Sequence, residues 1–277
     1  VDAHAAAVIE ALNAGCHVIT EKPMAMSVDE CRAMLAAAKA AGKTLAVDFE
    51  SRVIPHYRRI RSLIDQGMLG AVRAVHIDHF WDGHKPVGEL GERRKRFLDR
   101  SGCLDCGIHK IDLARYFSGG GAWRRIHAVG SWFGEKTVFP PHIAILATLD
   151  NGVMATINAS FAFTAYIPKR TANPNFQNLA IVGEKGVIVL HHTPSGAGEI
   201  EIVCEQMSAV EQTHPGNHKA DIAELLSLFA SAVQRGDPLP AEVATGYDGL
   251  MAQICMDEAN RQAVLAGDAS IPAPSGA

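Results

Sequence analysis

Apolar residues along the first part of the chain follow a helix–strand–helix–strand order. Residues 3–14 are rich in helix-forming side chains, and the β-branched run at 17–20 predicts a short buried strand. The next helix begins at Ser27, which forms a capping-box pattern with Glu30, and it runs to residue 41. Residues 45–49 predict a second strand. Helices that alternate with strands through short turns indicate a parallel sheet flanked by helices.

After residue 50 the pattern changes to many strands and few helices. A helix at 56–65 precedes the strands, and another at about 104–117 interrupts them. Asp150-Asn151-Gly152 is a hairpin signal between two of them. The predicted strands are 72–80, 127–133, 142–149, 153–163, 177–182, 187–191 and 199–203, and helices at about 218–234 and 244–264 close the chain. Adjacent strands of this kind predict a large, mainly antiparallel open sheet with helices on one face.

This order of elements divides the chain near residue 50. Residues 1–50 predict the C-terminal part of a doubly wound domain, and residues 51–277 predict a second domain built on the open sheet. The expected fold class is therefore α/β plus α+β. Such a fold does not by itself give a function, so the function has to be argued from particular residues.

Composition narrows the classes of function. Hydrophobic residues make up 48% and charged residues 20%, which is typical of a soluble globular protein with a sizeable core. The net charge is -4 and the only basic run is the four residues at 93–96, so we expect no nucleic-acid partner. No apolar run approaches the ~20 residues of a membrane helix. Six scattered cysteines need no disulfide framework, which favours a cytoplasmic protein.

Glu21-Lys22-Pro23 directly follows the first predicted strand. In doubly wound sheets ligands bind at the carboxyl ends of the strands, so a lysine there is well placed to reach a bound molecule. Pro23 restricts the backbone and disfavours a helical conformation at Lys22. The alternative is an ordinary surface lysine in a loop.

Asp105, His109 and Asp112 are spaced i, i+4 and i+7 on the helix that interrupts the strands, so they share one face. A carboxylate one turn from a histidine can orient the ring and raise its basicity, which suits general acid–base chemistry near neutral pH. The alternative is an aspartate that caps the helix and a partly buried structural histidine.

The same stretch also has a spacing that resembles a zinc site. Cys103, Cys106 and His109 could supply three ligands, but no further Cys or His lies near them in the sequence. We therefore expect no metal. The pairs His191-His192 and His214 with His218 have no obvious acidic or cysteine companion, and we interpret them as loop and helix-start residues.

Taken together, these motifs resemble the glucose–fructose oxidoreductase / inositol dehydrogenase (Gfo/Idh/MocA) family. Residues 4–23, which end in Glu-Lys-Pro, are similar to the family's signature segment, and residues 49–70 are similar to its domain crossover. The Asp-x-x-x-His helix of the family matches residues 105–109, and the closing helices, with Phe229 and 236–240, are similar as well. The resemblance covers essentially the whole chain.

This resemblance implies a Rossmann domain followed by a domain for substrate binding and dimerisation. It implies an enzyme that uses NAD or NADP to oxidise a sugar or polyol, and an association into a homo-oligomer. Glu21, Lys22 and Pro23 would lie at the cofactor, with Lys22 contacting the nicotinamide end and the reacting hydroxyl. Asp105 and His109 would act with Lys22 in catalysis, with His109 as the acid–base, and His79 would reach the substrate.

The chain departs from the family pattern in three places. Ser101-Gly102-Cys103 replaces a stretch richer in glycine, and Val1 stands where the family has an asparagine. The Gly-x-Gly-x-x-Gly turn and its acidic ribose ligand are absent. Because no methionine precedes Met24, we expect the chain to begin inside a longer protein, and we expect these 277 residues alone to bind a dinucleotide weakly.

Two other functions remain open from the sequence. Some relatives use bound nicotinamide to cleave glycosidic bonds through a transient oxidation, so an NAD-dependent glycosidase is one alternative. A non-catalytic fragment for dimerisation or binding is the other, and the presence of Lys22, Asp105 and His109 argues against it.

Overall fold

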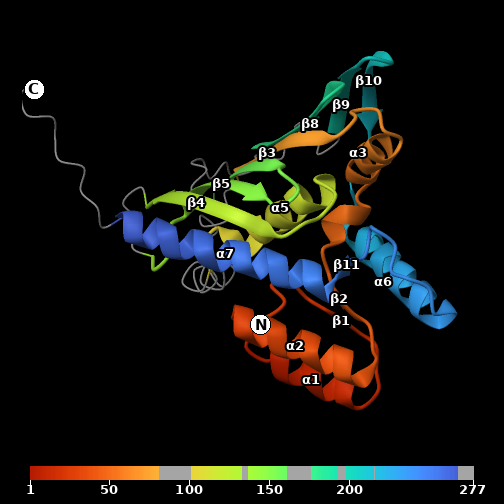
Figure 1. Ribbon diagram of the computed structural model, residues 1–277, viewed down its shortest axis with the longest axis vertical. Coiled ribbons are helices and arrows are strands. Elements are labelled where there is room, and N and C mark those ends of the chain that lie inside the picture. Colours follow the sequence, from red (N-terminus) through yellow and green to blue (C-terminus); the bar gives the residue numbers. More distant parts are fainter. Residues whose placement is uncertain (81–100, 133–136, 161–175, 193–197, 215, 268–277) are drawn as a thin grey trace, which may run out of the picture.

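The computed structural model describes residues 1–80, 101–132, 137–160, 176–192, 198–214 and 216–267, and the side chain of Asp105 is outside this description. The described strands form one sheet of three strands and one of eight. Figure 1 shows the small sheet with its two helices at one end of the molecule and the large sheet at the other, with the long helix α7 (Gly246–Gly267) between them.

The small sheet is built mainly by the first 50 residues. Its elements there are α1 (His4–Asn13), β1 (Val18–Thr20), α2 (Val28–Ala41) and β2 (Leu45–Val47). β1 and β2 pair in parallel, and Ser27 caps α2 by accepting a hydrogen bond from the backbone N–H of Glu30 at 3.2 Å. The predicted order and the capping box are therefore confirmed.

A strand from near the other end of the chain completes the small sheet. β11 (Ala244–Thr245) pairs antiparallel with β2. The small sheet thus draws on residues from both sides of position 50, and the division into 1–50 and 51–277 stays a prediction.

The large sheet has the order β10-β9-β8-β7-β3-β6-β5-β4. Its strands are β3 (Val72–Phe80), β4 (Trp123–Ser131), β5 (His142–Leu149), β6 (Met154–Ser160), β7 (Phe176–Gly183), β8 (Gly186–His192), β9 (Gly198–Cys204) and β10 (Met207–Thr213). Among the described strands of this sheet only β3 and β6 pair in parallel, so the prediction of a mainly antiparallel sheet is confirmed. β10 was not predicted.

Helices cover one face of this sheet. α5 (Leu104–Phe117) packs on β3 and β6, and α7 packs on β4, α2 and α5, as Figure 1 shows. The residues of β5 alternate accordingly: Ile143 and Ile145 are buried under the helices, whereas Leu146 is 46% exposed on the other face. Burial of this apolar face is the main source of stability for the sheet.

The remaining helical elements contact one another. The 3-10 helix η1 (Glu50–Val53) leads from β2 into α3 (Pro55–Asp65), and α6 (His218–Arg235) contacts η1. Asn217 caps α6, so His218 is a helix-start residue as predicted. η1 therefore lies at the junction of the two sheets.

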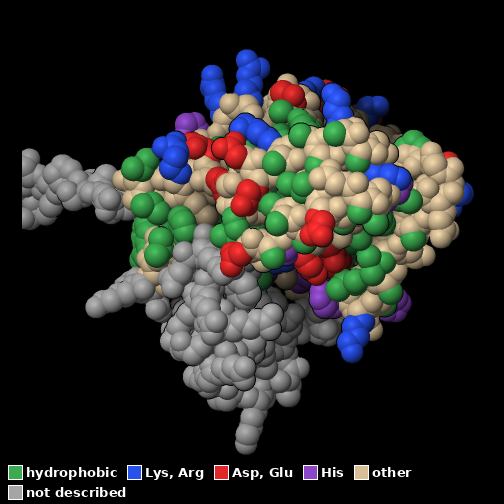
Figure 2. All heavy atoms as spheres, turned by 90° about the horizontal axis from the view of Figure 1, so that it is seen from below, with side chains coloured by type: hydrophobic (Ala, Val, Ile, Leu, Met, Phe, Trp, Pro, Cys, Tyr) green, Lys and Arg blue, Asp and Glu red, His purple; other side chains and the backbone are tan. Residues whose placement is uncertain are grey.

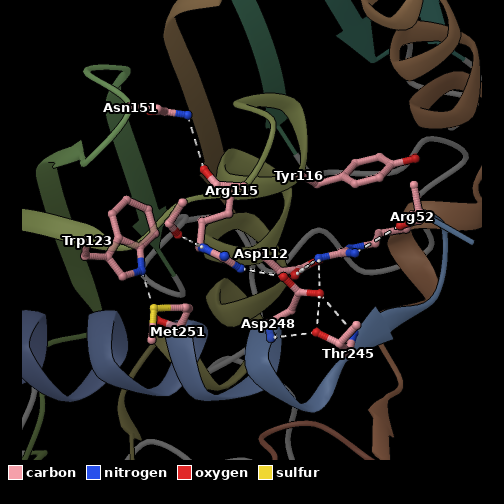
Figure 3. Close-up of polar contacts among 12 residues, drawn as sticks. Arg52, Asp112, Arg115, Tyr116, Trp123, Asn151, Thr245, Asp248 and Met251 are labelled. Carbon is pink, nitrogen blue, oxygen red and sulfur yellow. Dashed lines mark hydrogen bonds and ion pairs between the residues drawn. The ribbon is translucent and has the colours of Figure 1, made fainter. Parts of the chain in front are cut away.

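Buried ion pairs hold this junction together (Figure 3). Arg52 in η1 donates from Nε and Nη2 to the two carboxylate oxygens of Asp112 in α5, at 2.8 and 2.6 Å. Arg115 in α5 donates to Asp248 in α7 at 2.6 Å, and Asp248 also lies 3.5 Å from Arg52. Although Asp112 shares a helix face with His109 in the sequence pattern, its carboxylate is bound to Arg52 and serves the fold.

Two further observations concern partners. No helix in the described part of the chain is long and apolar enough to cross a membrane. Figure 2 views the molecule from the side of α1 and α2, and acidic and basic side chains both appear among its described atoms. The basic run at 93–96 lies outside the described residues.

Candidate active site

The ends of two parallel strands bring charged residues together. β1 is followed by Lys22, and β2 is followed by Asp48 and Glu50. The backbone N–H of Asp48 donates to the carbonyl of Thr20 at 2.7 Å, which continues the pairing up to the turn. Because the carboxyl ends of parallel strands lie at the same edge of a sheet, this edge is where a ligand of a doubly wound domain would bind.

The Glu21-Lys22-Pro23 turn is held by local contacts. The backbone N–H of Lys22 donates to the Glu21 carboxylate at 3.3 Å, and a ring nitrogen of His4 lies 3.1 Å from the carbonyl of Pro23. The Lys22–Pro23 peptide bond is cis. Pro23 is buried, Lys22 is half-buried and Glu21 is exposed.

His109 on α5 faces this edge. Its side chain is 12% exposed, its ring packs edge-on against Phe49 with centroids 5.7 Å apart, and its Nδ1 lies 3.5 Å from a Glu50 carboxylate oxygen. No hydrogen-bond partner for Nδ1 is present among the described residues, so the contact with Glu50 is close but not a formed hydrogen bond. Burial lowers the pKa of His109 well below its usual value, and the positive charges of Lys22 and Lys110 lower it further.

Asp48 and Glu50 are acids that hold protons more tightly than usual. Burial, and then the charge of Glu21, raises the pKa of Asp48 to about 6. Burial, and then the charge of Asp48, raises the pKa of Glu50 to about 7. The second carboxylate oxygen of Glu50 lies 3.8 Å from Nδ1 of His218. Glu50 is thus a carboxyl group that titrates near neutral pH between a buried and an exposed histidine.

His79 lies on β3 in the middle of the large sheet and is 7% exposed. Burial lowers its pKa well below the usual value, and the charge of Lys110 adds to this effect. His79 in turn contributes to the low pKa of His109, so the two rings lie within electrostatic reach of each other.

A polar cleft of about 390 Å³ adjoins Glu50 on the side of α3. The residues that matter for its chemistry are Glu50, His56, Lys110, Gln177, His192 and His218. They come from η1, α3, α5, β7, β8 and α6, so no short sequence motif could have identified the cleft.

Among the residues singled out in the sequence, Lys22 and His79 both lie within electrostatic reach of His109. Asp105 is the second residue of α5, whose N-cap is Cys103, so it does not cap the helix. Its side chain is outside the described residues, and its part in the site stays a prediction.

The alternative zinc site finds no support in the described residues. The thiol of Cys103 is buried and donates to the carbonyl of Ala159 at 3.3 Å. No group of three or more His, Cys, Asp or Glu side chains suited to a metal occurs in the part of the chain that the structure describes.

Our interpretation of the histidine pairs was partly wrong. His192 is the last residue of β8 rather than a loop residue, and its ring lies edge-on to His56 with centroids 4.9 Å apart. His191 and His218 do have acidic companions, because Glu201 and Glu50 lie 3.9 and 3.8 Å away. These partners are distant in sequence, so they could not be found by looking for neighbouring acids.

Sequence reasoning missed Asp48, Glu50, His56 and Lys110. Glu50 could have been found, because it directly follows the predicted strand 45–49, whereas Asp48 was assigned to that strand, which in the structure ends at Val47. His56 and Lys110 lie on helices, where the sequence gives no sign that their polar groups are buried.

Two family models match the chain. Residues 2–49 match the model described as "Oxidoreductase family, NAD-binding Rossmann fold", and residues 57–189 match the "GFO/IDH/MocA C-terminal domain". The two models belong to one family and match in its domain order.

Several known proteins are similar over most of the chain. The "Uncharacterized oxidoreductase YrbE" of Bacillus subtilis (strain 168) is 26% identical over 90% of this chain and 69% of its own length. The "D-glucoside 3-dehydrogenase" of Escherichia coli (strain K12) is 26% identical over 86% of this chain and 68% of its own length.

A solved structure shows the same fold. The inositol dehydrogenase homolog from Azotobacter vinelandii, complexed with NADH and myo-inositol, superimposes with a TM-score of 0.72 at 18% identity, covering 95% of this chain and 73% of that one. The two family models show that the chain belongs to the Gfo/Idh/MocA family of oxidoreductases.

Proposed function

We propose that this protein is an NAD- or NADP-dependent oxidoreductase that transfers hydride between a hydroxyl-bearing carbon of a sugar or polyol and nicotinamide. The observation that carries the proposal is the neutral, buried His109 within electrostatic reach of Lys22 at the carboxyl edge of β1 and β2. The substrate class is supported by the names of relatives, which include a D-glucoside 3-dehydrogenase and an inositol 2-dehydrogenase.

The carboxyl edge of the small sheet fits the nicotinamide end of the cofactor. Asp48 Oδ1 is buried there without a hydrogen-bond partner among the described residues, as expected where a polar ligand completes the site. We assign Glu21, Lys22 and Pro23 to hold this end. When bound, oxidised nicotinamide supplies the acceptor for the hydride.

In this mechanism His109 handles the proton. Its low pKa keeps the imidazole neutral at pH 7, so it can accept the proton of the substrate hydroxyl while the carbon loses hydride and becomes a carbonyl. The ammonium of Lys22 stabilises the negative charge that develops on that oxygen. We propose that Asp105 orients the imidazole and that His79 contacts the substrate.

Glu50 lies next to Nδ1 of His109, where it can assist the proton transfer. A carboxyl group with a pKa near 7, at 3.5 Å from Nδ1, can stabilise the imidazolium that forms when His109 takes the proton. We assign Glu50 a positioning role rather than a catalytic one.

We also propose that the protein forms a homo-oligomer through the open face of the large sheet. The strand register places large apolar side chains on the face opposite the helices, and they are 37–61% exposed. They are Val129, Leu146, Met154, Val182, Val203 and Val210. Exposed apolar surface of this kind typically marks a protein interface.

We propose a reducing compartment, the cytoplasm, because the six cysteines are scattered along the sequence in a pattern that needs no disulfide framework.

The test is a screen of sugars and polyols with NAD and NADP, using the protein as encoded by its gene. Reduction of the cofactor, followed by absorbance at 340 nm, is the expected result for at least one substrate. Cleavage of a glycoside without net reduction would instead identify an NAD-dependent glycosidase, and no turnover of either kind across the screen would contradict the proposal.

A further inference from the structure

Lys110 is a buried cation without an acidic partner among the described residues. It is 6% exposed, and its ammonium donates to Gln177 Oε1 at 3.0 Å and to the hydroxyl of Tyr57 at 3.4 Å. Both partners are neutral, and no described carboxylate lies within ion-pair distance of Lys110. Because buried charges in proteins are normally paired, this ammonium is suited to an anion that the chain does not itself supply.

Two imidazoles beside Lys110 also lack partners. His56 is 2% exposed, and neither of its ring nitrogens has a hydrogen-bond partner among the described residues; the same is true of His192 Nε2. Burial, and then the charges of His192 and Lys110, lowers the pKa of His56 to about 3. Burial and then Lys110 lower the pKa of His192 to about 4. Both rings are therefore neutral at pH 7, with nitrogens available to a ligand.

These groups line the cleft of about 390 Å³ that adjoins the candidate active site. Glu50 lines the cleft and also lies 3.5 Å from His109, so a ligand that reaches His109 could extend into the cleft. The volume is large enough for a carboxylate or phosphate group together with part of a sugar.

We propose that this cleft binds an anionic group, a carboxylate or a phosphate, through Lys110, His56 and His192. An anion there pairs the buried ammonium and supplies acceptors to the two rings. Its negative charge favours the protonated forms of the titratable groups around it, and Glu50, whose pKa is about 7, takes up protons from solution most readily near neutral pH. Two carboxyl groups, Glu50 and Asp221, also line the cleft, and an anion beside them favours their protonated forms, in which they donate hydrogen bonds.

Two alternative sources of the anion fit this cleft. It is an acidic substituent of the substrate, such as that of a uronic acid or a sugar phosphate, or it is a separate inorganic anion that occupies the cleft beside a neutral substrate. The first case rests on the proposed dehydrogenase function, whereas anion binding by itself does not.

The first experiment measures anion binding to the protein as encoded by its gene. Sulfate carries no exchangeable proton near pH 7, so calorimetric titration with sulfate in two buffers of different ionisation heat reports protons taken up by the protein alone. We expect saturable binding with net proton uptake. Lys110→Gln should weaken it by about 10- to 100-fold, the usual range for losing a hydrogen bond to a charged group.

Matched variants separate this effect from a general loss of structure. Lys39→Gln, on the exposed side of α2, should leave sulfate binding unchanged. His192→Asn keeps the charge of Lys110 but removes a ring nitrogen that would contact the anion, so it should weaken sulfate binding, and it provides the test if Lys110→Gln does not fold. Absence of saturable binding, or binding that Lys110→Gln and His192→Asn leave unaltered, would overturn the proposal.

The second experiment identifies the source of the anion. It compares kcat/KM for a hexose, its uronic acid and its 6-phosphate. A preference for an acidic sugar that Lys110→Gln removes, together with competition by sulfate, assigns the anion to the substrate. Sulfate binding without such preference or competition assigns it to a separate anion. Sulfate binding in a protein that oxidises no sugar would reject the dehydrogenase function while retaining the anion site.

Discussion

Replacing Arg52 by methionine should destabilise the protein because the buried carboxylate of Asp112 loses its partner. The side chain of Arg52 is 5% exposed and that of Asp112 is not exposed at all, and the two form a two-point ion pair at 2.6 and 2.8 Å (Figure 3). In the variant, Asp248 keeps Arg115 at 2.6 Å, so the charge that loses its partner is that of Asp112.

The expected cost follows from this burial. Removing one partner of a buried pair leaves an uncompensated charge and typically costs about 3–5 kcal/mol. Burial already raises the pKa of Asp112 against the opposing charge of Arg52, and without Arg52 the pKa rises further. The folded variant then binds a proton that the unfolded chain releases near neutral pH, so its stability is highest at low pH and falls as pH rises, by up to about 1.4 kcal/mol per unit.

The assay is urea unfolding of the wild type and the variant at about pH 5 and pH 8. Arg52→Met should lose more stability at the higher pH. The double variant Arg52→Met/Asp112→Leu should recover most of the loss, because apolar residues can replace a buried pair without penalty. Arg58→Met is the control: Arg58 and Glu224 form an exposed pair, worth under about 1 kcal/mol. An equal loss at both pH values, or no recovery in the double variant, would refute the reasoning.

Three further predictions concern the candidate site. His109→Ala should lower turnover by about 10²- to 10⁴-fold, the range for a general acid–base group, and steady-state rates near those of wild type would remove His109 from the mechanism. Lys22→Ala should lower turnover by a similar factor through lost charge stabilisation, whereas a change confined to KM would limit Lys22 to binding. Glu50→Gln should stabilise the protein at pH 8. The raised pKa of Glu50, about 7 against 4.5, gives stability below pH 4.5 that is lost as pH rises to 7, by up to about 3 kcal/mol. Unfolding curves whose pH dependence is the same in Glu50→Gln and wild type would contradict this.

Much of the fold could be predicted because its elements carry strong local patterns. β5, for example, alternates buried Ile143 and Ile145 with less buried neighbours, and α5 has the predicted bounds. β10 (Met207–Thr213) was missed because it is an edge strand in which no residue is fully buried, so it has no apolar alternation to detect. An edge strand depends on its pairing with β9, which the sequence does not reveal.

The candidate site could be predicted only in part. Lys22 and His109 were found because each lies in a short motif whose geometry follows from a strand end or a helix turn. Lys110 was missed because a lysine in a helix normally faces solvent, whereas α5 is enclosed by the sheet, α7 and η1. The carboxylate of Asp112 was assigned to the same face as His109, but its partner Arg52 is 60 residues away in the sequence, and only the tertiary structure brings them together.

Direct transfer of hydride from the substrate to the cofactor is the central claim, and isotopic labelling tests it most directly. A sugar or polyol that carries deuterium at the reacting carbon would be oxidised by the protein as encoded by its gene, and the reduced cofactor analysed by mass spectrometry. One deuterium in the reduced nicotinamide ring and a slower reaction with the labelled substrate are the predicted results, and the slow residual turnover of His109→Ala should still place deuterium in the cofactor. Deuterium released into water, with none in the cofactor, would contradict it.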